Sequence, residues 1–367
     1  MSKPRLSRRR LFGATALAGV ALAGGGGAIA YARTPGSIDE YLADALPQDA
    51  SLSVVAVRDR EVVYHRGFGL ADRKRNRRCG LNTAFDTGSL TKQFTAASIL
   101  RLEQDGELDV KDRVSRYLPG PIAGERGITI HHLLTHTAGL GELTGVGDYD
   151  PVSREDMLTA ATEMKPLTKP GAKHHYSNLG YSVLAAVVET VTSRGYEDFL
   201  HEKLFRPAGM RHTGYLLPDW RSADIAMQYD EHGEAEGRPN ELGWDDDGPY
   251  WVLRGNGGII ATPKDMAAWQ LALEGDDVLG PKAKRKLFKP YVPEDDSRES
   301  FYGYGWAITD DDAGRRIAWH DGSNGWSTAI LARSLDEGTM VFMATNAADW
   351  EFDGQTVAME LLEWLRE

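Results

Sequence analysis

Runs of apolar, often β-branched residues with the length of strands occur near both ends of the chain. The short segment Arg58–Arg60 separates the first two runs and predicts an antiparallel hairpin. Turns rich in Gly or Asp separate three further runs near the C-terminus. The predicted strands are Ser51–Val57, Glu61–Gly67, Arg315–Trp319, Ser327–Ala332 and Thr339–Ala344.

Between these runs, apolar residues recur at the three- and four-residue spacing of helices. One short helix is predicted before the first strand and one after the last, at Ser37–Leu46 and Asp353–Leu365. The central predicted helices are Leu90–Gln104, His131–Leu134, Arg154–Met164, Asn178–Thr192, Tyr196–Leu204 and Pro263–Leu273. The pattern predicts an α+β fold, an α/β sandwich whose antiparallel sheet is flanked by the terminal helices. We expect residues 33–105 and 285–367 to form this discontinuous domain, and residues 106–284 an inserted, mostly helical domain.

The N-terminal segment has a different pattern. Five basic residues precede an apolar, Gly-rich run, Leu11–Ala30. This pattern predicts a signal peptide over residues 1–32, cleaved after Ala30 or Ala32. The run Ser7–Phe12 resembles a twin-arginine signal, so we expect a bacterial or archaeal protein exported in folded form, periplasmic or secreted. An uncleaved membrane anchor is the alternative, and four consecutive glycines argue against it.

Composition narrows the classes of function. The 367 residues include 42 Lys and Arg against 54 Asp and Glu, a formal net charge of −12. Without residues 1–32 the balance is 37 against 54, or −17. Nucleic-acid and anionic-membrane surfaces need clustered Lys and Arg, so we expect neither partner and no stable membrane insertion after cleavage. The single cysteine, Cys79, excludes an intrachain disulfide and a Cys-based zinc site, and we expect it to be buried.

A Ser-x-x-Lys pattern opens the predicted helix that starts at Leu90. Residues three apart are neighbours on a helix surface, so the Lys92 ammonium is expected near the Ser89 hydroxyl. A serine needs an adjacent base to act as a nucleophile, and a lysine with a lowered pKa can supply it. The helix N-terminus favours a developing oxyanion. Taken alone, the pattern favours the structural interpretation, an N-cap serine and a solvated surface lysine.

A Pro-Gly loop, residues 170–178, ends in Tyr176-Ser177-Asn178 and leads into the next predicted helix. A phenol such as Tyr176 can relay a proton when neighbouring cations lower its pKa. The Asn178 amide can hold a substrate carbonyl and a lysine ammonium at once. The alternative is structural, with Asn178 capping the helix and Tyr176 packing at its foot.

His320-Asp321-Gly322-Ser323 follows a predicted strand. A glycine at a strand edge lets a substrate approach the backbone, and the Ser323 N–H is a candidate second oxyanion donor. His-x-Gly also occurs at residues 65–67 and 212–214, so only its context selects His320.

Taken together and in this order, the three segments resemble the three motifs of the serine β-lactamase and penicillin-binding-protein superfamily. The Tyr-x-Asn form is similar to its branch of class C β-lactamases, DD-peptidases and esterases. The resemblance runs from about residue 37 to the C-terminus. Four further segments look like that branch: Leu133–Leu140, Gly180–Ser182, Arg206–Met210 and Gly303–Trp306.

The resemblance implies a β-lactamase/transpeptidase-like fold and a serine hydrolase that needs no cofactor. Ser89 would be acylated, while Lys92 and Tyr176 would exchange protons. Asn178 would orient Lys92 and the substrate. The backbone N–H groups of Ser89 and Ser323 would form the oxyanion hole.

His320 stands where the class C enzymes carry the lysine of Lys-Thr-Gly, so His320 and Gly322 would contribute to substrate binding without a permanent cation. We therefore expect a small ester, amide or D-amino-acid peptide as substrate, with esterase, D-aminopeptidase or DD-carboxypeptidase activity favoured over efficient β-lactam hydrolysis. Two alternatives stay open. One is a catalytically silent protein that binds cell-wall fragments or a protein partner. The other is a metal hydrolase built on a histidine cluster, His131, His132, His136, His174 and His175.

Overall fold

A computed structural model describes residues 37–47, 50–124, 127–218, 220, 224–347 and 353–366. The predicted signal peptide, residues 1–32, lies outside these ranges. Within them, no helix has both the length and the apolar character that crossing a membrane requires.

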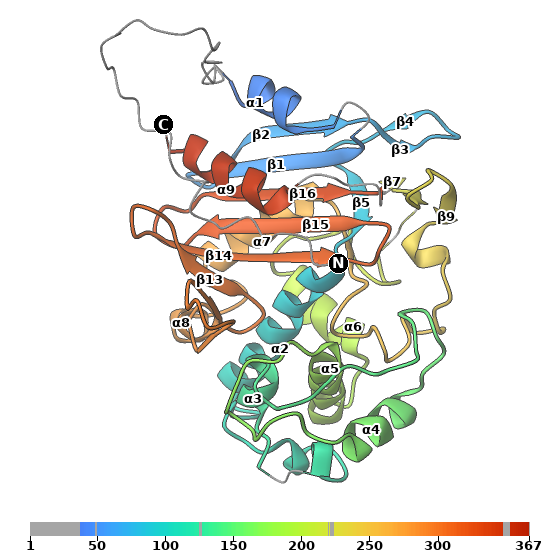
Figure 1. The fold of residues 1–367 in the computed structure, drawn as a ribbon, viewed down its shortest axis with the longest axis vertical. Coiled ribbons are helices and arrows are strands. Elements are labelled where there is room, and N and C mark those ends of the chain that lie inside the picture. The colour runs from blue at the N-terminus through green and yellow to red at the C-terminus, as the bar shows by residue number, and fades with distance from the viewer. Residues whose placement is uncertain are drawn as a thin grey trace, which may run out of the picture.

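An eight-stranded antiparallel sheet joins the two ends of the chain (Figure 1). Its strand order is β11-β12-β13-β14-β15-β16-β1-β2. The predicted N-terminal hairpin pairs with the last strand, with Leu52 opposite Thr345. The bounds are β1 Leu52–Arg58, β2 Glu61–Phe68, β11 Val292–Pro293, β12 Ser300–Tyr302, β13 Ala307–Asp310, β14 Arg316–Ser323, β15 Thr328–Ser334 and β16 Met340–Thr345. The predicted α+β fold, with its antiparallel sheet, is confirmed.

Helices cover both faces of this sheet, which is why its central strands are buried on both sides. In β1, Val54 packs in one apolar core and its neighbour Val55 in another. Successive side chains of a strand point to opposite faces, so each face needs its own cover. Three helices pack against the sheet: α1 (Ile38–Ala45) and α9 (Gly354–Trp364) contribute to the first core, and α7 (Pro263–Glu274) packs on β1 and β16.

The remaining helices form the lower part of the molecule in Figure 1. They are α2 Thr91–Asp105, α3 Ile130–Leu134, α4 Arg154–Glu163, α5 Asn178–Thr192, α6 Tyr196–Leu200 and α8 Pro281–Leu287. Helix α2 is buried along most of its length and packs against α5, α6 and α8. Its Phe94 ring meets Phe205 and Trp269 edge to face, at 5.1 and 5.0 Å between centroids. Helix α2 is therefore the shared core element of sheet and helices.

Some elements differ from the sequence-based expectation. Strand β14 continues through His320 to Ser323 rather than ending at Trp319. Helix α7 packs on the sheet, although its residues fall in the range expected to form the helical domain, and that division stays a prediction. A small sheet, β6-β10-β5-β7, was not expected; its strands are Thr213–Gly214, Ile260–Ala261, Thr83–Asp86 and Asp224–Ile225. Three of these strands, β6, β7 and β10, have only two residues each, too few to show the alternation of apolar and polar residues that indicates a strand.

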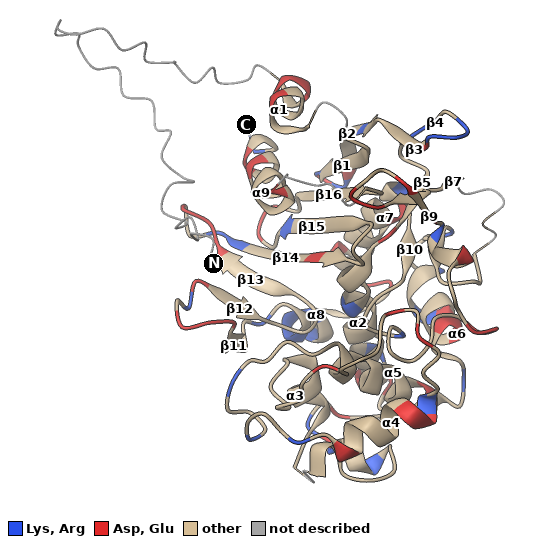
Figure 2. Cartoon of the chain, turned by 45° about the vertical axis from the view of Figure 1, so that its right-hand side comes forward, with Lys and Arg blue, Asp and Glu red and all other residues tan. Residues whose placement is uncertain are grey.

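Charged residues of both signs are intermingled over the outer helices and loops, as Figure 2 shows for the described elements. Cys79 is buried, and burial raises the pKa of its thiol to about 11. It packs as a small apolar side chain rather than a reactive thiolate.

Candidate active site

Ser89 lies in a 3-10 turn, Gly88–Leu90, that leads directly into α2. The turn touches the end of β14 backbone to backbone. A Cβ on Gly88 would lie 2.5 Å from the Ser323 nitrogen, and a Cβ on Gly322 would lie 2.5 Å from the Ser89 nitrogen. Gly88 also has a φ of +50°, a conformation that L side chains rarely adopt. The two glycines therefore let the N–H groups of Ser89 and Ser323 come together, although they are far apart in the sequence.

Lys92 is fully buried, and its ammonium contacts three segments of the chain. Nζ donates to Ser89 Oγ at 2.9 Å, to Asn178 Oδ1 at 2.7 Å and to the Asn256 carbonyl oxygen at 2.8 Å. Three acceptors satisfy the three donors of an ammonium group. The predicted proximity of Ser89, Lys92 and Asn178 is thus present in the fold.

Burial lowers the pKa of Lys92 to about 7, because the charged form loses its hydration. Three nearby carboxylates, those of Glu142, Asp148 and Asp321, act in the opposite direction and raise it. The result is a lysine that is partly neutral at physiological pH. The structural alternative, in which Lys92 is a solvated surface residue, is excluded because Lys92 is completely buried.

Asn256 was not expected from the sequence as part of the site. Its carbonyl oxygen accepts from Lys92, while its side chain donates to Ser182 Oγ at 2.9 Å and to the Val252 carbonyl oxygen at 2.8 Å. The loop Gly255–Gly258 that carries it includes two glycines with positive φ, at +84° and +79°. That cluster of glycines was the available signal, since it marks a tight loop whose backbone another group can approach closely.

Tyr176 lies beside the lysine, with Nζ of Lys92 4.8 Å from its ring centroid. The residue keeps 38% of its surface exposed, yet burial around the hydroxyl raises its pKa, and a hydrogen bond with Ser89 opposes this effect only in part. The condition named for a proton relay, a pKa lowered by neighbouring cations, is therefore not met at Tyr176. Desolvation of the phenolate outweighs them, so the phenol stays protonated at neutral pH.

His320 is buried in β14 and held in one neutral form. Its Nδ1–H donates to the Asp321 carbonyl oxygen at 2.5 Å, so Nε2 accepts from the Tyr302 hydroxyl at 3.0 Å. Burial lowers the pKa of His320 to about 4, although Asp321 raises it. At neutral pH this position therefore carries no charge.

His136 supports Tyr176 rather than a metal. It has a φ of +56°, accepts the Ser177 N–H on Nδ1 at 3.1 Å, and lies 4.4 Å from the Tyr176 ring between centroids. Burial lowers its pKa well below the ordinary value. Within the described ranges, no three His, Cys, Asp or Glu side chains form a group that suits a metal ion.

A buried carboxylate fixes the turn and the strand relative to each other. Asp86 Oδ1 accepts the Gly88 N–H at 2.7 Å, and Oδ2 accepts Asn324 Nδ2 at 2.8 Å. Asn324 also donates to the Tyr149 hydroxyl at 3.2 Å. Burial raises the pKa of Asp86 to about 6, and the two hydrogen bonds counteract it. Asp86 had no expected role from the sequence, because only the fold brings Asn324, 238 positions away, against it.

The fold and this arrangement are those of a serine hydrolase related to penicillin-binding proteins. A sequence profile described as Beta-lactamase matches residues 42–363, and the chain belongs to that family.

Penicillin-binding protein 4* of Bacillus subtilis (strain 168) is 31% identical over 320 residues, 82% of this chain and 69% of that protein. An octameric penicillin-binding protein homologue from Pyrococcus abyssi has a TM-score of 0.77 at 26% identity, over 90% of this chain and 76% of that one. The fold is also that of a D-stereospecific amidohydrolase from a Streptomyces species, with a TM-score of 0.69 at 23% identity over 86% and 95% of the two chains.

We predict that Asp86→Asn lowers kcat for hydrolysis roughly 10- to 100-fold, because a buried donor left unpaired at a cost of about 1–3 kcal/mol shifts the Ser89 turn away from the end of β14. Gly88 and Asn324 donate to different oxygens of the carboxylate, and in the amide an NH2 group replaces one of them, so one donor faces another donor. The measurement is steady-state kinetics, with the melting temperature checked to show that the variant is folded.

The matched control is the exchanged pair, Asp86→Asn with Asn324→Asp. The new amide then accepts from Gly88 and donates to the new carboxylate, which rebuilds the contact in the reverse direction. Asn324→Asp alone brings two carboxylates together and lowers kcat as well. A double variant as slow as the product of both single losses contradicts this role for Asp86.

Proposed function

We propose that this protein hydrolyses an ester or amide bond through an acyl-enzyme formed on Ser89. One observation carries the proposal, namely the contact of 2.9 Å between Ser89 Oγ and the buried Nζ of Lys92. A lysine whose pKa is about 7 exists in part as the free amine, which can accept the serine proton. A catalytically silent protein has no need of a lysine desolvated against a serine.

The proposed proton movements use the contacts of Ser89 with Lys92 and Tyr176. Neutral Lys92 takes the proton of Ser89 as Oγ bonds to the substrate carbonyl carbon. The oxygen of the tetrahedral intermediate accepts from the N–H groups of Ser89 and Ser323. Collapse breaks the bond to the leaving group, which takes a proton from Tyr176, and Tyr176 is reprotonated from Lys92. Water then attacks the acyl carbon and gives its proton to Lys92. Collapse breaks the bond to Ser89 Oγ, which is reprotonated, and the acid is released.

Asn178 holds Lys92 through its Oδ1, which leaves its amide NH2 for a substrate carbonyl. We propose that His320 and Gly322 border the substrate through β14, and that His320 meets it as a neutral ring. Acidic side chains nearby, Glu142, Asp148 and Asp321, favour a neutral or cationic substrate over an anionic one. A small ester, an amide or a D-amino-acid peptide without a carboxylate near the scissile bond fits these charges better than a carboxylate-bearing β-lactam.

We also propose that residues 1–32 direct export by the twin-arginine route, from the basic and apolar pattern of that segment. The mature enzyme would then act in the periplasm or outside the cell.

We predict that a fluorophosphonate forms a covalent adduct on Ser89, found by peptide mass spectrometry, and that Ser89→Ala loses both the adduct and roughly a thousandfold or more of kcat. Nitrophenyl esters, D-Ala-D-Ala peptides and nitrocefin, assayed side by side, rank the substrate classes. We expect nitrocefin to be the poorest. Labelling at another residue, or full activity of Ser89→Ala, overturns the mechanism.

The pH dependence of kcat/KM should show an acidic limb centred near pH 7. Below the pKa of Lys92, at about 7, the amine is protonated and cannot accept the serine proton, so the rate falls about tenfold per pH unit. Above it the rate levels off. Lys92→Arg should abolish activity while keeping the charge, because arginine stays protonated throughout this range. A flat profile from pH 5 to 9 contradicts a lysine base.

For export, we expect Arg9→Lys with Arg10→Lys to leave the protein in the cytoplasm of a bacterial host. Fractionation followed by immunoblotting measures this, and the unaltered chain should appear in the periplasm at reduced length. Equal export of both forms argues against the twin-arginine route.

A further inference from the structure

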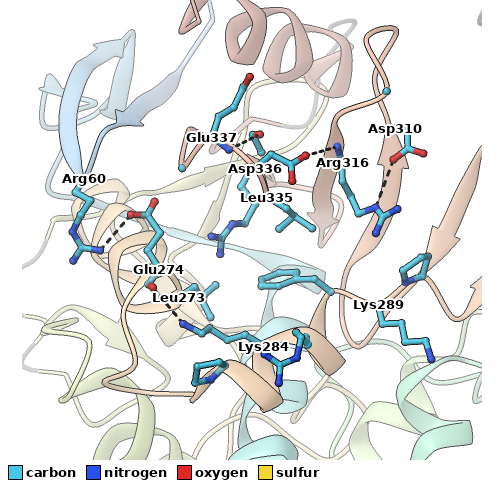
Figure 3. A pocket seen from close by; sticks show the side chains of 18 of the residues that line it. Arg60, Leu273, Glu274, Lys284, Lys289, Asp310, Arg316, Leu335, Asp336 and Glu337 are labelled. Carbon is cyan, nitrogen blue, oxygen red and sulfur yellow. Dashed lines mark hydrogen bonds and ion pairs between the residues drawn. The ribbon is translucent and has the colours of Figure 1, made fainter.

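A pocket of about 1340 Å³ lies at the end of the sheet opposite the candidate active site (Figure 3). Helices α7 and α8 and the turns β1–β2, β13–β14 and β15–β16 surround it. Strand β14 relates the two places, since Arg316 at its start lines the pocket and Ser323 at its end lies beside Ser89. Seven strand steps separate these residues by about 23 Å. The pocket is therefore a second site, not an extension of the first.

Arg333 of β15 lines this pocket and is 4% exposed. Two of its guanidinium nitrogens, Nε and Nη1, are buried with no hydrogen-bond partner among the described residues. The guanidinium carbon lies 4.9 Å from the centroid of the Phe288 ring. Burial lowers the pKa of Arg333 to about 10, so it keeps its charge at neutral pH. A buried charge with unused donors is strongly unfavourable unless something pairs with it.

The carboxylates around the pocket already have other partners. Glu274, whose charge acts on Arg333, contacts Arg60 at 3.4 Å and accepts from Gln270 at 2.7 Å. Figure 3 shows this Arg60–Glu274 contact at one side of the pocket. The other carboxylates that line the pocket are also paired with groups other than Arg333. The pairs are Asp310 with Arg316 at 3.6 Å, Asp336 with the Arg316 N–H at 3.2 Å, Glu337 with Arg366 at 2.5 Å, and Asp59 with Arg58 at 3.9 Å.

Of the other five cations that line the pocket, Arg60, Lys284 and Arg316 pair with carboxylates, which leaves Arg285 of α8 and Lys289 after it. Among the described residues, no ion pair within 4.0 Å engages either of them or Arg333. Lys289 lies 5.2 Å from the Tyr291 ring centroid. The local excess of charge is thus positive, although the chain as a whole is acidic.

We propose that this pocket binds a small ligand through a carboxylate or phosphate group on Arg333. Apolar side chains at the same place, Phe288, Leu273 and Leu335, suit an aromatic or alkyl body attached to that group. A carboxylate or phosphate can accept two parallel hydrogen bonds from the N–H groups of a planar guanidinium group.

Inorganic phosphate and phenyl phosphate are the probes, used with the folded protein at pH 7 in calorimetric titration and in thermal unfolding. We expect both to bind at one site, phenyl phosphate more tightly, and to raise the melting temperature. Arg333→Met should lose this binding at least tenfold. Without ligand it should melt no lower than the unaltered protein, because an uncompensated buried charge is gone.

The controls separate specific binding from other effects. Phosphate stabilises folded proteins generally, so the measure is the difference between the unaltered protein and Arg333→Met at equal ionic strength. Arg298→Met removes an exposed arginine outside the pocket and should bind phosphate normally. Prior labelling of Ser89 should leave binding unchanged. Equal stabilisation of Arg333→Met, or loss of binding in Arg298→Met, overturns the proposal, as does a strong destabilisation of Arg333→Met in ligand-free buffer.

Discussion

The burial of one lysine ammonium is the interaction on which the candidate site depends. A charge in the interior is tolerated only when its donors are satisfied, and Lys92 finds its acceptors on three separate segments: the Ser89 turn, the start of α5 at Asn178, and the loop of Asn256. The same desolvation that makes this placement costly lowers the pKa of Lys92 to about 7. The burial of Lys92 is thus the reason both for its three hydrogen-bond acceptors and for its lowered pKa.

A second constraint acts on the backbone. The turn before α2 and the end of β14 approach so closely that side chains at Gly88 and Gly322 would collide with backbone atoms. Asp86 holds this contact by accepting from both sides, through Gly88 and Asn324. The N–H groups of Ser89 and Ser323 lie beside each other because of this contact, so the oxyanion site that we propose there would need no reorganisation during a reaction.

The neutral state of His320 distinguishes the site from one with a lysine at that place. Its imidazole has two partners, Tyr302 and the Asp321 carbonyl group, and burial removes its charge at neutral pH. The electrostatic field in the site therefore comes from Lys92 and from the carboxylates of Glu142, Asp148 and Asp321. Desolvation keeps Tyr176 protonated, which suits the neutral proton donor that we propose it to be.

The sequence by itself determined the main strands and helices, and also the candidates Ser89, Lys92, Tyr176 and Asn178, because periodicity and local spacing are properties of neighbouring residues. The three motifs, in their order along the chain, also indicated the family. Only the tertiary structure decided the roles of Asp86 and Asn256, and the protonation states of Tyr176 and His320. Those depend on desolvation and on contacts between residues up to 238 positions apart, as for Asp86 and Asn324, and one-dimensional patterns do not contain them.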